Sequence, residues 1–293
     1  MRISKDIYPF EGSYLDLNGL RLHYLDEGKG DPVVMVHGNP TWSIYYRNLV
    51  HALMGSYRTV VPDHMGCGLS DKPDDAHYDY TLTQRVDDLE ALLSHLKIND
   101  KITLVLHDWG GMIGMGYAAR HPGSIHRLVL LNTSAFHKPE EKPFPWLLWL
   151  CRNTRLGAFL IYKLNAFSRT AARICCKRCT MSREIREAYI SPYMESSIAT
   201  LRFVQDIPLR CGDRAFDTVT GIQEKLSLFR QIPVLICWGE KDFVFDKHFL
   251  YEWIRIFPQA EVHRFPDCGH YVLEDATEEI TDLVRDFLAN HPI

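Results

Sequence analysis

The chain has 293 residues, of which 46% are hydrophobic and 24% are charged, and its formal net charge is −4. This composition is that of an ordinary globular protein with enough apolar residues for one large core, and it excludes a disordered or fibrous chain. Because no long run of one charge sign and no nucleic-acid-binding motif is present, we expect a small-molecule partner and no nucleic acid.

The sequence gives no signal for export or for a membrane span. The N-terminal segment has no apolar stretch of signal-peptide length, and no segment elsewhere runs ~18 apolar residues without a charge. We therefore expect a cytoplasmic protein whose eight cysteines are reduced thiols. Cys175, Cys176 and Cys179 cluster and could suggest a metal, but no second ligand pair lies at zinc spacing. We expect small residues on a helix there instead.

Strand-like and helix-like segments alternate in the first half of the chain. Segments 14–17 and 21–28 flank an Asn18-Gly19 turn signal and predict an opening hairpin. Short apolar runs rich in β-branched residues are typical of strands buried on both faces of a parallel sheet. They occur at 32–38, 59–63, 102–108 and 127–132, with helical periodicity over 81–98 and 110–121.

The alternation breaks between residues 136 and 212, where only helix-like patterns occur. It resumes with a strand at 232–242, a helix at 249–257, a strand at 260–270 and a closing helix at 278–291. We therefore predict an α/β core made of residues 1–135 and 213–293, with residues 136–212 inserted as an all-helical cap. The proline-rich segment 137–145 is the predicted hinge.

The first part of the cap is unusually apolar, with large side chains at helical spacing: Trp146, Trp149, Leu150, Phe159 and Leu160. They could line an apolar pocket, or they could simply pack on the core. Arg152 and Arg155 interrupt the segment too early for a membrane span. The sequence does not indicate membrane association, although interfacial binding or burial in a homo-oligomer stays open.

The segment 106–111, Leu-His-Asp-Trp-Gly-Gly, lies between a predicted buried strand and a helix rich in small residues. This pattern predicts a nucleophile elbow, a tight turn that lifts one side chain to the edge of the sheet. The lifted side chain is Asp108, which is ionised at neutral pH and needs no base to activate it. A carboxylate that attacks a saturated carbon forms an ester that water can cleave. The alternative interpretation is a simple helix N-cap.

The partners of such a nucleophile follow in the chain order acid, then histidine. Asp242 lies just past one predicted strand and His270 just past the last one, so both should meet Asp108 at the carboxyl edge of the sheet. His270 is the candidate base that activates water, and Asp242 would orient it. Glu240 and His263 are the rival acid and base, both ranked lower.

Asn39 belongs to a loop, residues 37–40, that should face the elbow. The backbone amides of Asn39 and Trp109 are candidate oxyanion donors. Their side-chain N–H groups are neutral donors that suit a departing halide. The alternatives are a turn residue for Asn39 and core packing for Trp109.

Together, these motifs resemble the haloalkane dehalogenases of the α/β-hydrolase fold. The resemblance rests on residues 37–50, 62–73, 105–111, 237–242 and 266–275. It implies a mostly parallel sheet flanked by helices, and hydrolysis of carbon–halogen bonds to an alcohol and a halide ion without metal or organic cofactor. Some relatives carry the acid where this chain has Asn132, so Asp242 points to the third branch of the family.

Three other functions stay open. Segments 37–49 and 62–73 are also similar to the β-lactone decarboxylases of bacterial long-chain olefin biosynthesis, whose catalytic residues would occupy the same positions. Epoxide hydrolases also carry an aspartate elbow but need cap tyrosines, for which Tyr162, Tyr189 and Tyr193 are candidates. A ligand-binding protein without activity is the third. The main expectation is a dehalogenase acting on a small apolar haloalkane, with the β-lactone decarboxylase as its alternative.

Overall fold

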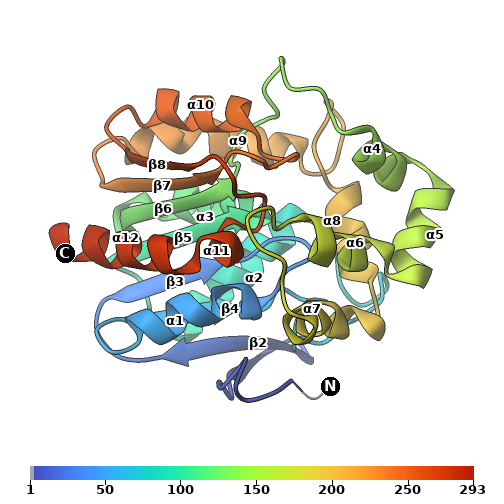
Figure 1. The fold of residues 1–293 in the computed structure, drawn as a ribbon, viewed down its shortest axis with the longest axis horizontal. Helices are drawn as coiled ribbons and strands as arrows, with labels where there is room; N and C mark the ends of the chain where they lie inside the picture. The colour runs from blue at the N-terminus through green and yellow to red at the C-terminus, as the bar shows by residue number, and fades with distance from the viewer. Residues whose placement is uncertain (1–2) are drawn as a thin grey trace.

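The computed structural model describes residues 3–293 and is organised around an eight-stranded sheet (Figure 1). Its strand order is β1-β2-β4-β3-β5-β6-β7-β8. β1 pairs with β2 and β2 with β4 in antiparallel fashion, and the other neighbouring strands are parallel. The predicted hairpin and mostly parallel sheet are therefore confirmed. The strands are β1 (Ser13–Leu17), β2 (Leu20–Glu27), β3 (Pro32–Val36), β4 (Arg58–Pro62), β5 (Ile102–Asp108), β6 (Ile125–Thr133), β7 (Val234–Gly239) and β8 (Glu261–Phe265).

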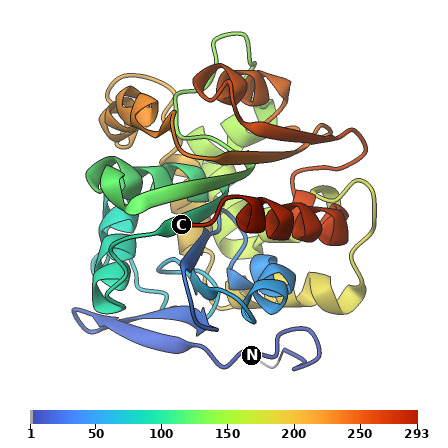
Figure 2. The ribbon, with the colours of Figure 1, turned by 90° about the vertical axis from the view of Figure 1, so that its left-hand side faces the viewer.

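Helices cover both faces of this sheet, which is why its central strands are continuous apolar runs. Every residue of β5 is buried. Figure 2 shows α1 and α12 on one face and α2 and α3 on the other. The helices of the core are α1 (Arg47–Leu53), α2 (Leu82–His95), α3 (Trp109–Arg120), α10 (Lys247–Ile256), α11 (Val272–Asp275) and α12 (Thr277–Asn290), with the 3-10 helices η1 (Ser43–Tyr46) and η2 (Pro122–Ser124).

The elements that the structure describes between β6 and β7 are all helical. Helices α4 to α7 gather at the end of the molecule opposite the C-terminus (Figure 1), whereas α9 packs against α3 in the core. The division at residues 135 and 212 stays a prediction. These helices are α4 (Trp146–Asn153), α5 (Arg155–Leu164), α6 (Ala166–Ile174), α7 (Arg183–Ile190), η3 (Ser191–Met194), α8 (Ile198–Gln205), α9 (Phe216–Lys225) and η4 (Leu226–Phe229).

Across the described residues, each helix is too short or too polar to cross a bilayer. All eight cysteines are free, as predicted. The prediction of a helix over Cys175, Cys176 and Cys179 is wrong, because α6 ends at Ile174. The Asp275 carboxylate accepts backbone N–H groups from Lys177, Arg178, Cys179 and Gly269, and these converging bonds hold the segment as a turn against the loop that carries His270.

The turn between β5 and α3 is closely packed on two sides. Asp108 has φ 52° and ψ −125° there, a backbone conformation that costs energy for a residue with a Cβ. A Cβ on Gly110 would lie 1.9 Å from the Val36 carbonyl oxygen, and one on Gly111 would lie 2.0 Å from Thr133 Oγ1. The two glycines thus let α3 begin against β3 and β6, which fixes Asp108 at the edge of the sheet.

We expect Gly110→Ala to lower the free energy of unfolding by ~1–3 kcal/mol or more, because the new methyl group meets backbone that cannot move aside easily. The midpoint of urea unfolding measures this effect. The control is Gly221→Ala in α9, where no atom lies within 4 Å of the added Cβ. This change should be neutral or stabilise by up to ~1 kcal/mol through helix propensity. Equal effects of the two substitutions would contradict the steric explanation.

Candidate active site

The structure brings Asp108, Asp242 and His270 together at the carboxyl edge of the sheet. Asp108 ends β5, Asp242 follows β7 and His270 follows β8. His270 Nδ1 lies 2.7 Å from Asp242 Oδ2, and its Nε2 lies 3.5 Å from Asp108 Oδ2. All three side chains are buried. The geometry is that of a nucleophile, a histidine and an orienting acid.

The charges of this cluster depend on one another. Burial by itself lowers the pKa of His270, but the charges and hydrogen bonds of Asp242 and Asp108 outweigh it and raise that pKa to about 10. Burial by itself raises the pKa of Asp108, but the hydrogen bond and charge of His270 lower it, with help from the Asn39 N–H. In the resting protein, an imidazolium therefore lies between two carboxylates.

This charge state decides what His270 can do at each stage. While Asp108 is ionised, His270 keeps its proton at neutral pH and can stabilise negative charge on a leaving group. If Asp108 formed an ester, one of the two charges that hold the proton would be gone, and the pKa of His270 would fall. His270 would then be suited to take a proton from water.

Asn132 helps to hold the acid, a role that sequence reasoning missed. Its Nδ2 lies 3.0 Å from Asp242 Oδ2, the oxygen that also faces His270, and 3.0 Å from the Gly239 carbonyl oxygen. Its Oδ1 accepts the N–H of Gly239 at 2.8 Å. In the sequence, Asn132 only argues against an acid at its own position, because nothing local indicates that β6 supports the loop after β7.

Asn39 and Trp109 flank Asp108 as predicted from their loops. The Asn39 backbone N–H donates to Asp108 Oδ1 at 2.6 Å, so this amide already stabilises negative charge on the carboxylate. The Asn39 side-chain amide donates to the Thr200 carbonyl oxygen of α8 at 3.3 Å, which leaves one of its two N–H groups for a ligand. Trp109 packs beside Phe203 of α8, with ring centroids 5.4 Å apart.

An apolar cavity of about 520 Å³ opens onto this cluster. Asn39, Asp108, Trp109 and His270 belong to its lining. Most of the remaining lining is apolar and comes from α4, α5, α6 and the loop after β7. The cavity therefore suits an apolar ligand whose reacting group meets Asp108.

The rival residues lie elsewhere. Glu240 pairs with Arg264 at 3.2 Å, and His263 lies on β8 with Nε2 2.7 Å from Glu261. The cavity lining contains no tyrosine among the described residues. Tyr189 donates to Glu274, Tyr193 donates to the Thr41 carbonyl oxygen, and Tyr162 is exposed. The tyrosine acid that an epoxide hydrolase needs is thus not found at the cavity.

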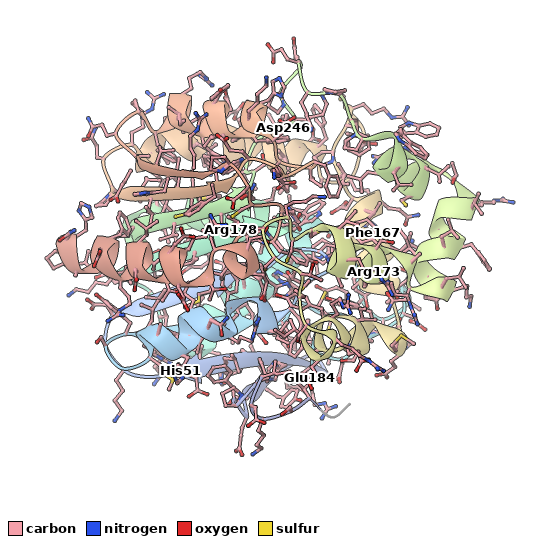
Figure 3. All side chains as sticks on the ribbon, in the orientation of Figure 1. His51, Phe167, Arg173, Arg178, Glu184 and Asp246 are labelled. Carbon is pink, nitrogen blue, oxygen red and sulfur yellow. The ribbon has the colours of Figure 1, made fainter. Side chains whose placement is uncertain are left out.

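Two further polar residues near the site were missed. His107 Nε2 lies 2.9 Å from the His270 carbonyl oxygen, and burial lowers the pKa of His107 to about 3, so it is neutral and donates this bond. Lys142 lines the cavity and pairs with Asp246 at 2.8 Å, which ties the hinge to the segment after Asp242. Asp246 is labelled in Figure 3. The position of His107 next to the predicted nucleophile is the one sequence signal that could have identified it as a residue of the site.

Comparison with known proteins places the chain among two groups of relatives. A family model described as alpha/beta hydrolase fold matches residues 31–277. The cis-3-alkyl-4-alkyloxetan-2-one decarboxylase of Shewanella oneidensis is 58% identical over 96% of this chain and 89% of its own length. The protein of the same name from Xanthomonas campestris pv. campestris is 48% identical over 98% of both chains.

The dehalogenases are more distant relatives. A haloalkane dehalogenase of Mycolicibacterium paratuberculosis is 30% identical over 94% of this chain and 92% of its own. The crystal structure of the haloalkane dehalogenase DbeA from Bradyrhizobium elkani superposes with a TM-score of 0.82 at 27% identity, covering 95% and 97% of the two chains. The expected resemblance and fold class are therefore confirmed, and the greater similarity is to the alternative function.

The charge of His270 can be followed directly by nuclear magnetic resonance of its ring nitrogens. We expect its pKa to lie near 10 in the native protein and to fall by about one unit or more in Asp108→Asn, because one of two neighbouring negative charges is removed. Glu240→Gln is the matched control and should leave the titration unchanged. A His270 that titrates near neutral pH with Asp108 intact would show that the imidazolium is not held as described.

Proposed function

The chain belongs to the α/β hydrolase fold family, and on that premise we propose that it is a β-lactone decarboxylase. The reaction would convert a cis-3-alkyl-4-alkyloxetan-2-one into an alkene and carbon dioxide. The observation that carries the proposal is the contrast in identity. The two decarboxylases match at 58% and 48%, whereas the dehalogenase of Mycolicibacterium paratuberculosis matches at 30%.

The site supports a first step that opens the lactone ring. The Asp108 carboxylate attacks the saturated, alkyl-bearing ring carbon that is bonded to the ring oxygen, not the carbonyl carbon, and the bond between that saturated carbon and the oxygen breaks. The product is an alkyl ester of Asp108, and the carbon next to the esterified carbon carries a free carboxylate. This carboxylate is an anionic leaving group, as a halide is. Protonated His270 and the N–H groups of Trp109 and Asn39 are donors suited to stabilise it.

A second step releases both products. The bond between the carboxylate and its neighbouring carbon breaks, carbon dioxide leaves, and the electron pair forms the carbon–carbon double bond. The ester bond to Asp108 breaks at the same time and restores its carboxylate. The sequence of steps consumes no water and needs no net proton. Inversion in the first step followed by anti elimination in the second gives the cis alkene.

The cavity is consistent with this substrate class. Its lining is mainly apolar and its volume is about 520 Å³, which suits two alkyl substituents on a small polar ring. Dehalogenation remains the second candidate, because Trp109 and Asn39 both line the cavity next to Asp108 and could bind a halide. Both reactions begin with attack of a carboxylate on a saturated carbon.

A substrate panel tests the proposal. We expect alkene, measured by gas chromatography, from a synthetic cis-3-alkyl-4-alkyloxetan-2-one, and little halide from brominated alkanes under the same conditions. Asp108→Asn should reduce alkene formation to background, and Trp109→Phe should slow it by ~100-fold, since one donor to developing charge is lost. Glu240→Gln should behave as the native protein. Rapid halide release without alkene formation would favour the dehalogenase instead.

Heavy-oxygen water separates the two chemistries on the protein itself. After single turnovers of the lactone, the peptide that contains Asp108 should carry no added label in its mass spectrum, because no water attacks the ester. A haloalkane that is hydrolysed should instead label Asp108. Labelling of Asp108 during lactone turnover, together with a β-hydroxy acid product, would contradict decarboxylation from the ester.

A further inference from the structure

Helices α4 and α5 expose an apolar surface that is unusual for a globular protein. More than half of the large hydrophobic side chains exposed in the described residues lie on these helices or on α6. We call the surface formed by α4 and α5 the cap face. It consists of Trp146, Leu147, Trp149, Leu156, Phe159, Tyr162 and Leu164.

The two sides of α5 differ in their exposure to solvent. Gly157 and Ile161 are buried toward the rest of the cap. Leu156 and Phe159 are exposed by 58% and 53%, three residues apart on the opposite side of the helix. An ordinary surface helix carries polar residues on its outer side. Figure 1 shows α5 at the edge of the molecule, where its outer side faces away from the sheet.

The charged side chains within α4, α5 and α6 all have one sign. Residues 146–174, which form α4 to α6, contain five arginines or lysines and no aspartate or glutamate, although the whole chain has a net charge of −4. Four of these cations are exposed and form no ion pair among the described residues: Arg155, Lys163, Arg169 and Arg173. Figure 3 labels Arg173 on α6. Exposed apolar side chains can insert into a lipid interface, and neighbouring cations without ion-pair partners attract anionic headgroups, so this surface is complementary to an anionic lipid surface.

The active-site cavity reaches the same surface. Trp146, Leu147 and Ile174 line the cavity and are also exposed. Phe167 of α6, labelled in Figure 3, belongs to the lining as well. A molecule dissolved in the hydrocarbon of a bilayer would therefore meet the cavity rim without crossing water.

We propose that the cap face docks on the surface of an anionic phospholipid bilayer, with α4 and α5 in contact with the lipid. Aromatic and leucine side chains enter the interface, and the four cations contact lipid phosphates. Docking itself does not depend on which reaction the site performs. On the proposed function it also gives an apolar lactone and its alkene product a direct path between the bilayer and the cavity.

The test uses the full-length protein and vesicles of phosphatidylcholine containing about one-third phosphatidylglycerol. We expect the protein to float with these vesicles and to bind pure phosphatidylcholine much more weakly. Raising the salt from ~0.1 M to ~0.5 M should weaken binding by ~10-fold or more, because four exposed cations contribute. Binding that is equal on both vesicles and insensitive to salt would overturn the proposal.

Tryptophan fluorescence locates the contact. Trp146 and Trp149 are exposed, whereas Trp42, Trp109, Trp238 and Trp253 are buried. Vesicles should therefore shift the emission to shorter wavelength, and brominated lipid should quench it. The double variant Trp146→Phe/Trp149→Phe should lose both signals while it still floats. Signals that persist in this variant would show that another surface touches the lipid.

Two sets of substitutions complete the test. Phe159→Ser with Lys163→Gln and Arg169→Gln should reduce vesicle binding by ~10-fold or more. The matched control changes exposed residues outside the cap, Leu228→Ser with Lys29→Gln and Lys97→Gln, and should bind as the native protein does. If no binding occurs and the cap-face variant instead disperses a dimer seen by sedimentation, the surface contacts a second copy and the proposal is wrong. Lactone turnover in detergent, measured on the same variant, separates docking from catalysis.

Discussion

A buried imidazolium between two carboxylates is the interaction on which the rest of the site depends. Burying a charge is costly unless partners lie close and are themselves held in place. His270 has such partners in Asp242 at 2.7 Å and Asp108 at 3.5 Å. The three residues lie at the ends of three different strands, so they meet only when these strands are correctly aligned in the sheet. Asn132 adds a fourth strand to this requirement through its bond to Asp242.

Hydrogen bonds hold the strained and closely packed backbone around the cluster in place. Asp108 adopts a positive φ, and its carbonyl oxygen accepts the hydroxyl of Thr133 at 2.5 Å. On the other side of the site, Asp275 gathers backbone N–H groups from Gly269 and from the turn after α6. Because one carboxylate binds both, the cap segment after α6 and the loop of His270 form one unit. Movement of the segment after α6 would therefore also shift the loop that carries His270.

The same set of charges could serve both candidate reactions. In each reaction, as proposed for this chain, the Asp108 carboxylate would attack a saturated carbon and an anion would depart toward N–H donors. The reactions diverge afterwards, because a halide diffuses away whereas a carboxylate stays attached to the substrate and can leave as carbon dioxide. On this proposal, the cavity would select the substrate, and its lining comes mainly from the predicted cap. The same region carries the exposed apolar face and its cations, so the proposed substrate selection and the proposed bilayer docking would depend on the same helices.

The sequence by itself determined the parts of this protein that follow from short-range patterns. Buried strands appear as continuous apolar runs, and the glycines after Asp108 indicate the elbow. The positions of Asp108, Asp242 and His270 just after three predicted strands place them at the same edge of the sheet, so their meeting could be predicted. The motifs could not separate decarboxylase from dehalogenase, since the proposed catalytic residues are the same in both. Tertiary structure alone decided that Asn132 supports Asp242, that residues 175–179 form a turn around Asp275, and which side of α5 faces outward. The physical reason is that each of these depends on a contact between segments far apart in the chain, about which local periodicity carries no information.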